Sequence, residues 1–199
     1  KRNDKVIVFT DAYKRNIKKI AVTVANAGEQ FTDHIKYIEY FPTGCHGTEP
    51  PEEVWIEAFG LNAVKELRHK NLLKLLIEKN ISDRKIRLAE QIIRKNKKEA
   101  VNAVIALSYF STSHTRFRDM LNRICRARYA SMPLFDEQML EGAMMVNWNA
   151  MQKRTESMAG IVNKYQDIEI ETPNGSSISF SKKGRKAKSD TGIIKRPGS

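Results

Sequence analysis

Apolar residues recur at helical spacing in one segment after another of this chain. Between residues 11 and 28, the positions i, i+3, i+4 and i+7 are occupied by Ile17, Ile20, Ala21 and Val24. The same spacing recurs in residues 51–59, 62–80, 83–96, 100–110, 115–130 and 136–165. Such stripes are typical of amphipathic helices that bury one face. The sequence therefore predicts a mainly α fold, a bundle of about seven helices, with the apolar segment 100–110 as its central helix.

Three stretches depart from this pattern. Residues 5–9, KVIVF, form a short apolar run that predicts a strand or an extended arm, and residues 30–41 are ambiguous between helix and strand. Residues 168–180, IEIETPNGSSISF, alternate on both sides of Asn-Gly, which is a strong hairpin signal. We thus expect four parts: an N-terminal extended arm (1–10), a helical core domain (11–165), a β-hairpin (166–181) and a flexible basic tail (182–199).

The chain is strongly basic, with a formal net charge of +12. This balance indicates a polyanionic partner, nucleic acid before an anionic membrane surface. Basic residues gather in segments 1–20, 65–98, 114–130 and 182–199, whereas acids concentrate in 21–64 and 131–181. Basic parts of one copy meeting acidic parts of the next would favour a homo-oligomer, assembled through the terminal arms. The alternative is that folding mixes the two signs over one even surface.

Residues 114–130 contain five arginines and no lysine. On a helix, Phe117, Met120, Leu121 and Ile124 would share the packed face, while Arg116, Arg123 and Arg126 would form a stripe opposite. Arg118 and Arg128 would flank the apolar arc. A guanidinium makes bidentate hydrogen bonds to phosphate and stacks on bases, which lysine does not do. The alternative is that these arginines pair with acids of residues 136–141 or of another acidic helix.

Two further basic clusters are candidate nucleic-acid contacts. One is the compact run at the end of the predicted helix 83–96, and the other lies in the tail. Together with the arginine-rich segment, the candidate contact residues are Arg116, Arg118, Arg123, Arg126, Arg128, Arg94, Lys95, Lys97, Lys98, Lys182, Lys183, Arg185 and Lys186. Among nearby aromatic residues, Phe117 is assigned to the core, and Tyr129 is a candidate for stacking on bases.

No motif of a known catalytic class is present: there is no Walker loop, GxGxxG, GxSxG or HExxH. Cys45 and His46, with His34, match no zinc spacing, and the acids between Glu49 and Glu57 fall at a predicted helix start, where acids are common. We therefore expect no enzyme, no metal and no cofactor.

The cysteines and the hydropathy bear on location. Cys45 and Cys125 cannot form a disulfide framework, which indicates an intracellular, reducing compartment. No apolar run reaches about 18 residues, so we expect no membrane insertion. There is also no signal-peptide pattern at the start.

The hypothesis that follows is a nucleic-acid-binding protein without sequence specificity that self-assembles on its polymer. A viral nucleocapsid or filament coat subunit, located in the virion, would behave in this way. The alternative is a helical DNA-binding regulator with 115–130 as its recognition helix, although this segment offers mainly Asn122 to read bases. Two other possibilities remain: a structural protein whose basic surface meets acidic proteins, and an enzyme of unrecognised type.

Overall fold

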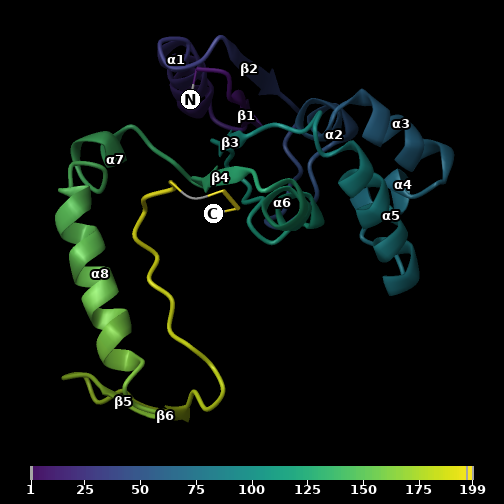
Figure 1. The fold of residues 1–199 in the computed structure, drawn as a ribbon. Helices are drawn as coiled ribbons and strands as arrows, with labels where there is room; N and C mark the ends of the chain where they lie inside the picture. Colours follow the sequence, from purple (N-terminus) through teal and green to yellow (C-terminus); the bar gives the residue numbers. More distant parts are fainter. Residues whose placement is uncertain (1, 196, 199) are drawn as a thin grey trace. The chain divides into compact units, whose positions relative to one another are not determined.

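The computed structural model describes residues 2–195 and 197–198 and divides into two compact units. The first comprises residues 1–140 and the C-terminal residues from 194 onward, and the second comprises residues 141–193. The first unit holds most of the helices and a four-stranded sheet in the order β2-β1-β3-β4, in which every neighbouring pair is parallel (Figure 1). The prediction of a mainly α bundle is therefore wrong, because the chain has an α/β fold.

In the first unit, single helical segments connect β1 to β2 and β3 to β4, and four helices in succession connect β2 to β3. The elements of this unit are β1 (Lys5–Thr10), α1 (Arg15–Gly28), β2 (His34–Glu39), α2 (Glu52–Phe59), α3 (Leu61–His69), α4 (Leu73–Ile77), α5 (Asp83–Asn96), β3 (Ala103–Ala106), α6 (Arg116–Met120), the π-helical turn η1 (Leu121–Cys125), β4 (Arg128–Ser131) and α7 (Gln138–Glu141). The helices predicted over 51–59 and 83–96 are present as α2 and α5.

The strands of the parallel sheet replace one predicted helix and settle two segments that the sequence left open. Residues 103–106, within the predicted central helix 100–110, form β3, and their continuous apolar run fits a strand and a helix equally well. The ambiguous segment 30–41 contains β2. The N-terminal segment is an inner strand: Val6 pairs with Ile35 on one side and with Ala103 on the other. It is therefore not an arm.

Helices cover both faces of the sheet. Successive side chains of β1 point to opposite faces: Ile7 and Phe9 lie in the larger core, with side chains of α2 to α6, whereas Val8 packs with Ala21 and Ala25 of α1 on the other face. Ser82 begins α5 in an extended conformation, and Ile86, Ala89, Ile92 and Ile93 are its buried side chains, as their spacing predicts.

The connections leave the sheet in opposite directions at one point. After β1 the chain crosses the face covered by α1 to reach β2, and after β3 it crosses the other face through α6 to reach β4. Since β1 and β3 are neighbours, the loops that follow them diverge. Ligands of open α/β sheets bind at the carboxyl ends of strands, next to such a switch point.

The second unit is built from α8 (Trp148–Val162) and a hairpin of β5 (Asp167–Glu171) and β6 (Ser177–Ser181). The hairpin occurs where Asn-Gly predicted it: Ile170 pairs with Ile178, and Gly175 turns the chain at a φ of 88°. The long helix predicted over 136–165 is instead α7 and α8, because Asn147 starts a new helix by accepting a hydrogen bond from Ala150 N at 3.0 Å.

Among the described residues, no helix is both long enough and apolar enough to cross a membrane.

Candidate functional site

The arginine-rich segment is not a single helix. It forms α6 and η1 and then β4, with Arg126 between them in the left-handed region at a φ of 62°. The helix predicted over 115–130 therefore ends at Cys125, and Arg128 lies on a strand. Phe117 is fully buried and belongs to the core, as expected. Tyr129 is only 3% exposed, and its hydroxyl lies 2.7 Å from that of Thr112. The stacking role suggested for Tyr129 is therefore wrong.

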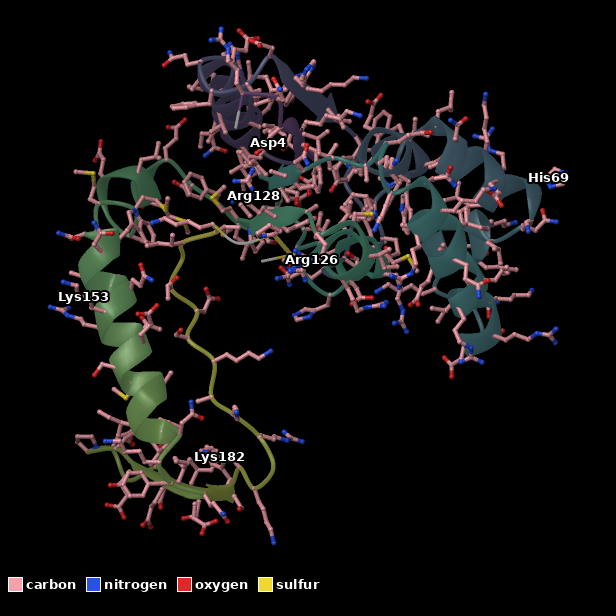
Figure 2. All side chains as sticks on the ribbon, in the orientation of Figure 1. Asp4, His69, Arg126, Arg128, Lys153 and Lys182 are labelled. Atoms are coloured by element: carbon pink, nitrogen blue, oxygen red, sulfur yellow. The ribbon has the colours of Figure 1, made fainter. Side chains whose placement is uncertain are left out.

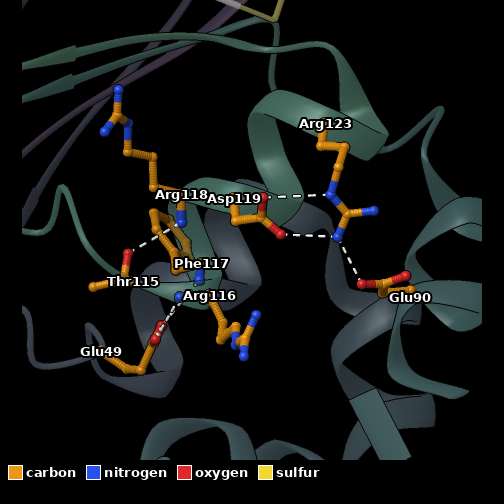
Figure 3. Close-up of polar contacts among 8 residues, drawn as sticks. All are labelled: Glu49, Glu90, Thr115, Arg116, Phe117, Arg118, Asp119 and Arg123. Carbon is orange, nitrogen blue, oxygen red and sulfur yellow. Dashed lines mark hydrogen bonds and ion pairs between the residues drawn. The ribbon is translucent and has the colours of Figure 1, made fainter. Parts of the chain in front are cut away.

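Glu49 holds the beginning of α6 in place. Its buried carboxylate accepts hydrogen bonds from the backbone N–H groups of Arg116 and Phe117, the latter at 3.0 Å (Figure 3). Burial raises the pKa of Glu49, and the two backbone hydrogen bonds oppose that rise. The side chain of Thr115 caps the same turn by accepting from Arg118 N at 3.1 Å. Both carboxylate oxygens of Glu49 are thus engaged within the protein.

Three of the five arginines contact their own chain. Arg123 bonds to Asp119 at 2.8 Å and to Glu90 at 2.6 Å, and these carboxylates, Asp119 first, raise the pKa of Arg123 (Figure 3). Arg128 pairs with Asp4 at 2.5 Å (Figure 2). The acids that pair with arginine here are therefore not those of residues 136–141.

Arg118 is the third arginine held within the chain. It donates to Ser113 O at 3.0 Å, and its guanidinium carbon lies 5.7 Å from the centre of the Tyr129 ring. Arg116 and Arg126 are exposed instead, and no described carboxylate forms an ion pair with either.

Helix α5 lies beside α6 and η1. The ion pair between Glu90 and Arg123 joins them, and Lys97 lies close enough to Cys125 to lower its pKa, although burial is the larger effect and raises that pKa to about 11. Residues 87, 90, 94 and 97 share one side of α5 and its last turn. This side faces η1, because Glu90 contacts Arg123 and Lys97 lies near Cys125. We call the basic surface the set Arg87, Arg94, Lys97, Lys98, Arg116, Arg123 and Arg126.

The remaining candidate contacts lie elsewhere. Lys95 is exposed on α5 but pairs with Glu66 of α3 at 3.1 Å. The four tail residues, Lys182, Lys183, Arg185 and Lys186, belong to the second unit. There Lys182 N bonds to Gln166 O, and Arg185 N bonds to Lys182 O, both at 2.8 Å. The structure thus places the segment of Arg87, Arg94, Lys97 and Lys98 beside η1, which carries Arg123. Arg116 and Arg126 lie at the two ends of α6 and η1.

Asp11 links the two loops of the switch point. It is fully buried, and its carboxylate accepts from the backbone N–H groups of Tyr109 and Phe110, both at 2.9 Å, and from that of Tyr13 at 3.3 Å. The loop after β3 is therefore anchored to the end of β1.

A second loop, residues 42–50, is tied to the loop after β3. Gly47, at a φ of 80°, donates its N–H to Ser111 O at 2.7 Å, and Ser111 N donates to His46 Nδ1 at 3.0 Å. Lys79 Nζ donates to Gly47 O. Beside these loops lies a hollow of about 500 Å³, lined by Glu49, Lys79, Ile81, Ile86, Ser113, His114, Thr115, Arg116 and Asp119. Sequence reasoning missed this hollow, because its residues come from segments far apart in the chain.

Metal binding has little support in the described part of the chain. His46 Nδ1 already accepts the hydrogen bond from Ser111 N. Over residues 2–195 and 197–198, no group of three or more His, Cys, Asp or Glu side chains is placed to hold a metal ion.

Comparisons with protein-family models, with curated proteins and with solved structures find no match to this chain.

Proposed function

We propose that this protein binds nucleic acid through phosphate contacts from the basic surface, without reading base sequence. The observation that carries the proposal is that two basic segments, residues 87–98 and 116–126, lie side by side in the fold. Only Glu90 and Asp119 lie among these cations, and both are bonded to Arg123. The remaining cations of the surface are exposed, and among the described residues none of them forms an ion pair, so they can neutralise phosphates.

The dimensions of the basic surface suit a polymer backbone. From Arg87 to Asn96, helix α5 rises about 14 Å at 1.5 Å per residue. Lys97 and Lys98 follow its last turn, so the cations of this segment reach several successive phosphates. On the neighbouring segment, Arg116 lies at the beginning of α6 and Arg126 directly after η1. This segment lies beside α5. Their planar guanidinium groups can bond a phosphate with two parallel hydrogen bonds.

Base readout has less support than phosphate contact. The alternative of a regulator needs a helix ending near Phe110 and a recognition helix over 115–130. The segment before Phe110 holds strand β3, and residues 128–131 form β4. The side chains of Phe117, Met120 and Ile124 point into the core and cannot enter a groove. The fold therefore lacks the recognition helix that this alternative requires.

The N-terminal segment is not available as an arm for self-assembly. Residues 5–10 form β1, the strand between β2 and β3, so they cannot be exchanged between copies without opening the sheet. We therefore propose that a single chain binds nucleic acid without exchanging residues 5–10 with another copy.

A triple substitution tests the proposal. We expect Arg94→Gln, Lys97→Gln and Arg126→Gln together to weaken binding to unrelated single-stranded and duplex oligomers by about tenfold or more at low salt. The slope of log K against log salt should become shallower by about 2 for single strands and by nearly 3 for duplexes, because three phosphate contacts are lost. Fluorescence anisotropy over a series of salt concentrations measures both quantities.

The matched control removes three exposed cations outside the basic surface, with Lys65→Gln, Lys70→Gln and Lys85→Gln. This variant has the same net charge as the first and should keep most of the affinity and of the salt slope. Equal losses in the two variants would show that net charge alone drives binding. Preference for one duplex sequence over others by more than about a thousandfold, where the scale of specific recognition begins, would contradict binding without readout.

A further inference from the structure

We infer that the hollow beside the loop after β3 is a binding site for a small organic phosphate. It is separate from the phosphate contacts proposed for the basic surface, although Arg116 lies on both. The site is described by Lys79, Ser113, His114 and Arg116, with Ile81 and Ile86 on its apolar side. Its volume, about 500 Å³, falls in the range of pockets that hold small molecules.

The position of the hollow is the first argument. His114 and Arg116 lie in and just after the loop that follows β3, at the carboxyl end of a strand beside the switch point. Side chains from separate segments converge there, since Lys79 follows α4 and Ile86 lies on α5. Open α/β sheets bind their ligands in this region.

The hydrogen bonds that the residues lining the hollow already form indicate that its ligand is an anion. Every acidic oxygen in the hollow is engaged: Glu49 accepts the N–H groups of Arg116 and Phe117, and Asp119 accepts both Nε and Nη2 of Arg123. The hydroxyls are engaged too, Ser113 with Ser131 at 2.8 Å and Thr115 with Thr112 O at 2.7 Å.

The cationic side chains of the hollow, in contrast, have N–H donors that are not used within the described part of the chain. Among the described residues, the guanidinium of Arg116 and the ring of His114 form no hydrogen bond within the chain. Lys79 uses one of its three N–H donors, on Gly47 O. A ligand that supplies acceptors and negative charge would complete the site, and a phosphate monoester supplies three strong acceptor oxygens.

The walls of the hollow are held in place before a ligand arrives. Residue 111 is bonded to Gly47 and His46, and the turn at residues 115–117 is fixed by Glu49 and Thr115. A site held by such supporting contacts pays little ordering entropy on binding. Ile81 and Ile86 would contact the apolar body of the ligand, which favours an organic phosphate over inorganic phosphate.

The test uses phenyl phosphate as the probe, followed by two-dimensional NMR of the whole chain. We expect saturable shifts at residues 79, 81 and 113–116, together with shifts of the His114 ring signals. Inorganic phosphate should bind at the same place more weakly, and phenol, which lacks the charge, should produce no saturable shifts there. Benzoate distinguishes carboxylate from phosphate: binding as tight as that of phenyl phosphate would overturn the assignment to phosphate.

A pair of matched variants sharpens the result. Lys79→Gln with His114→Gln should weaken phenyl phosphate binding by about tenfold or more, since two charge-assisted hydrogen bonds are lost. Lys65→Gln with His69→Gln removes the same residue types from exposed positions of α3 and should leave binding unchanged. Because Lys79 also supports Gly47, His114→Gln alone is the second variant, with an expected loss of a few fold.

Two further results would overturn the inference: shifts that do not saturate, or equal affinity in wild type and both hollow variants. None of these variants changes the basic surface, so nucleic-acid binding should persist in them. Loss of phenyl phosphate binding with oligomer binding intact would separate this site from the proposed function. The reverse pattern is expected for the triple variant at residues 94, 97 and 126.

Discussion

Replacement of Phe117 by alanine should lower the free energy of unfolding by about 3–5 kcal/mol, the usual cost of removing a buried aromatic side chain. Phe117 is fully buried, and its ring lies 5.4 Å from that of Trp55, 5.6 Å from that of Phe59 and 6.2 Å from that of Phe9. All three contacts have the edge-to-face geometry that aromatic pairs prefer. Urea unfolding followed by circular dichroism measures the change.

Phe117→Leu is the control for this prediction. Leucine keeps the site apolar and fills more of it, so the loss should be smaller than that for alanine. Similar stability of Phe117→Ala and wild type would show that the α6 turn is not packed as described. Because Phe117 also orders the turn that carries Arg116, nucleic-acid binding should be compared only at temperatures where both variants are folded.

Replacement of Asp11 by alanine should lower the free energy of unfolding by about 3 kcal/mol, because partly buried backbone N–H groups lose a charged acceptor. The carboxylate accepts from Tyr109 N and Phe110 N at 2.9 Å and joins the end of β1 to the loop after β3. The direct measurement is hydrogen exchange: the amides of residues 109 and 110 should lose protection well before those of β3.

Asp11→Asn separates the hydrogen bonds from the side-chain volume. Its carbonyl oxygen can still accept from Tyr109 N, but its amide nitrogen cannot accept from Phe110 N, so the loss should fall between those of wild type and alanine. Unchanged protection of residues 109 and 110 in Asp11→Ala would refute the role of this carboxylate. Since the same loop carries His114, phenyl phosphate binding should weaken in parallel.

Helices with one buried face could be predicted from the sequence, and the buried inner strand β3 could not. The stripe of Ile86, Ala89, Ile92 and Ile93 defines α5 because one side of that helix meets solvent. Strand β3 is four residues long and covered on both faces, so Val104 and Ile105 show no alternation that distinguishes it from a helix. The change from η1 to β4 occurs at Arg126, in a left-handed conformation that no glycine marks.

The candidate site could be predicted only in part. The sequence drew attention to arginines 116, 123 and 126, but their partners depend on tertiary structure: Glu90, which pairs with Arg123, lies 33 positions away. The hollow near His114 could not be foreseen, because residues 49, 79 and 114 meet only after the sheet has formed. Arginine enrichment identified the segment, while the fold decides which of its members are exposed.

The inner position of β1 has a consequence for how the chain folds. Val6 pairs with Ala103, and Asp11 bonds to Tyr109, so the first strand gains its second neighbour only when a segment about one hundred residues later is in place. Contacts of such long sequence separation slow folding, because the intervening chain must be ordered first. During synthesis, an edge of β1 stays open until β3 leaves the ribosome, and this interval is when the nascent chain is most exposed to aggregation.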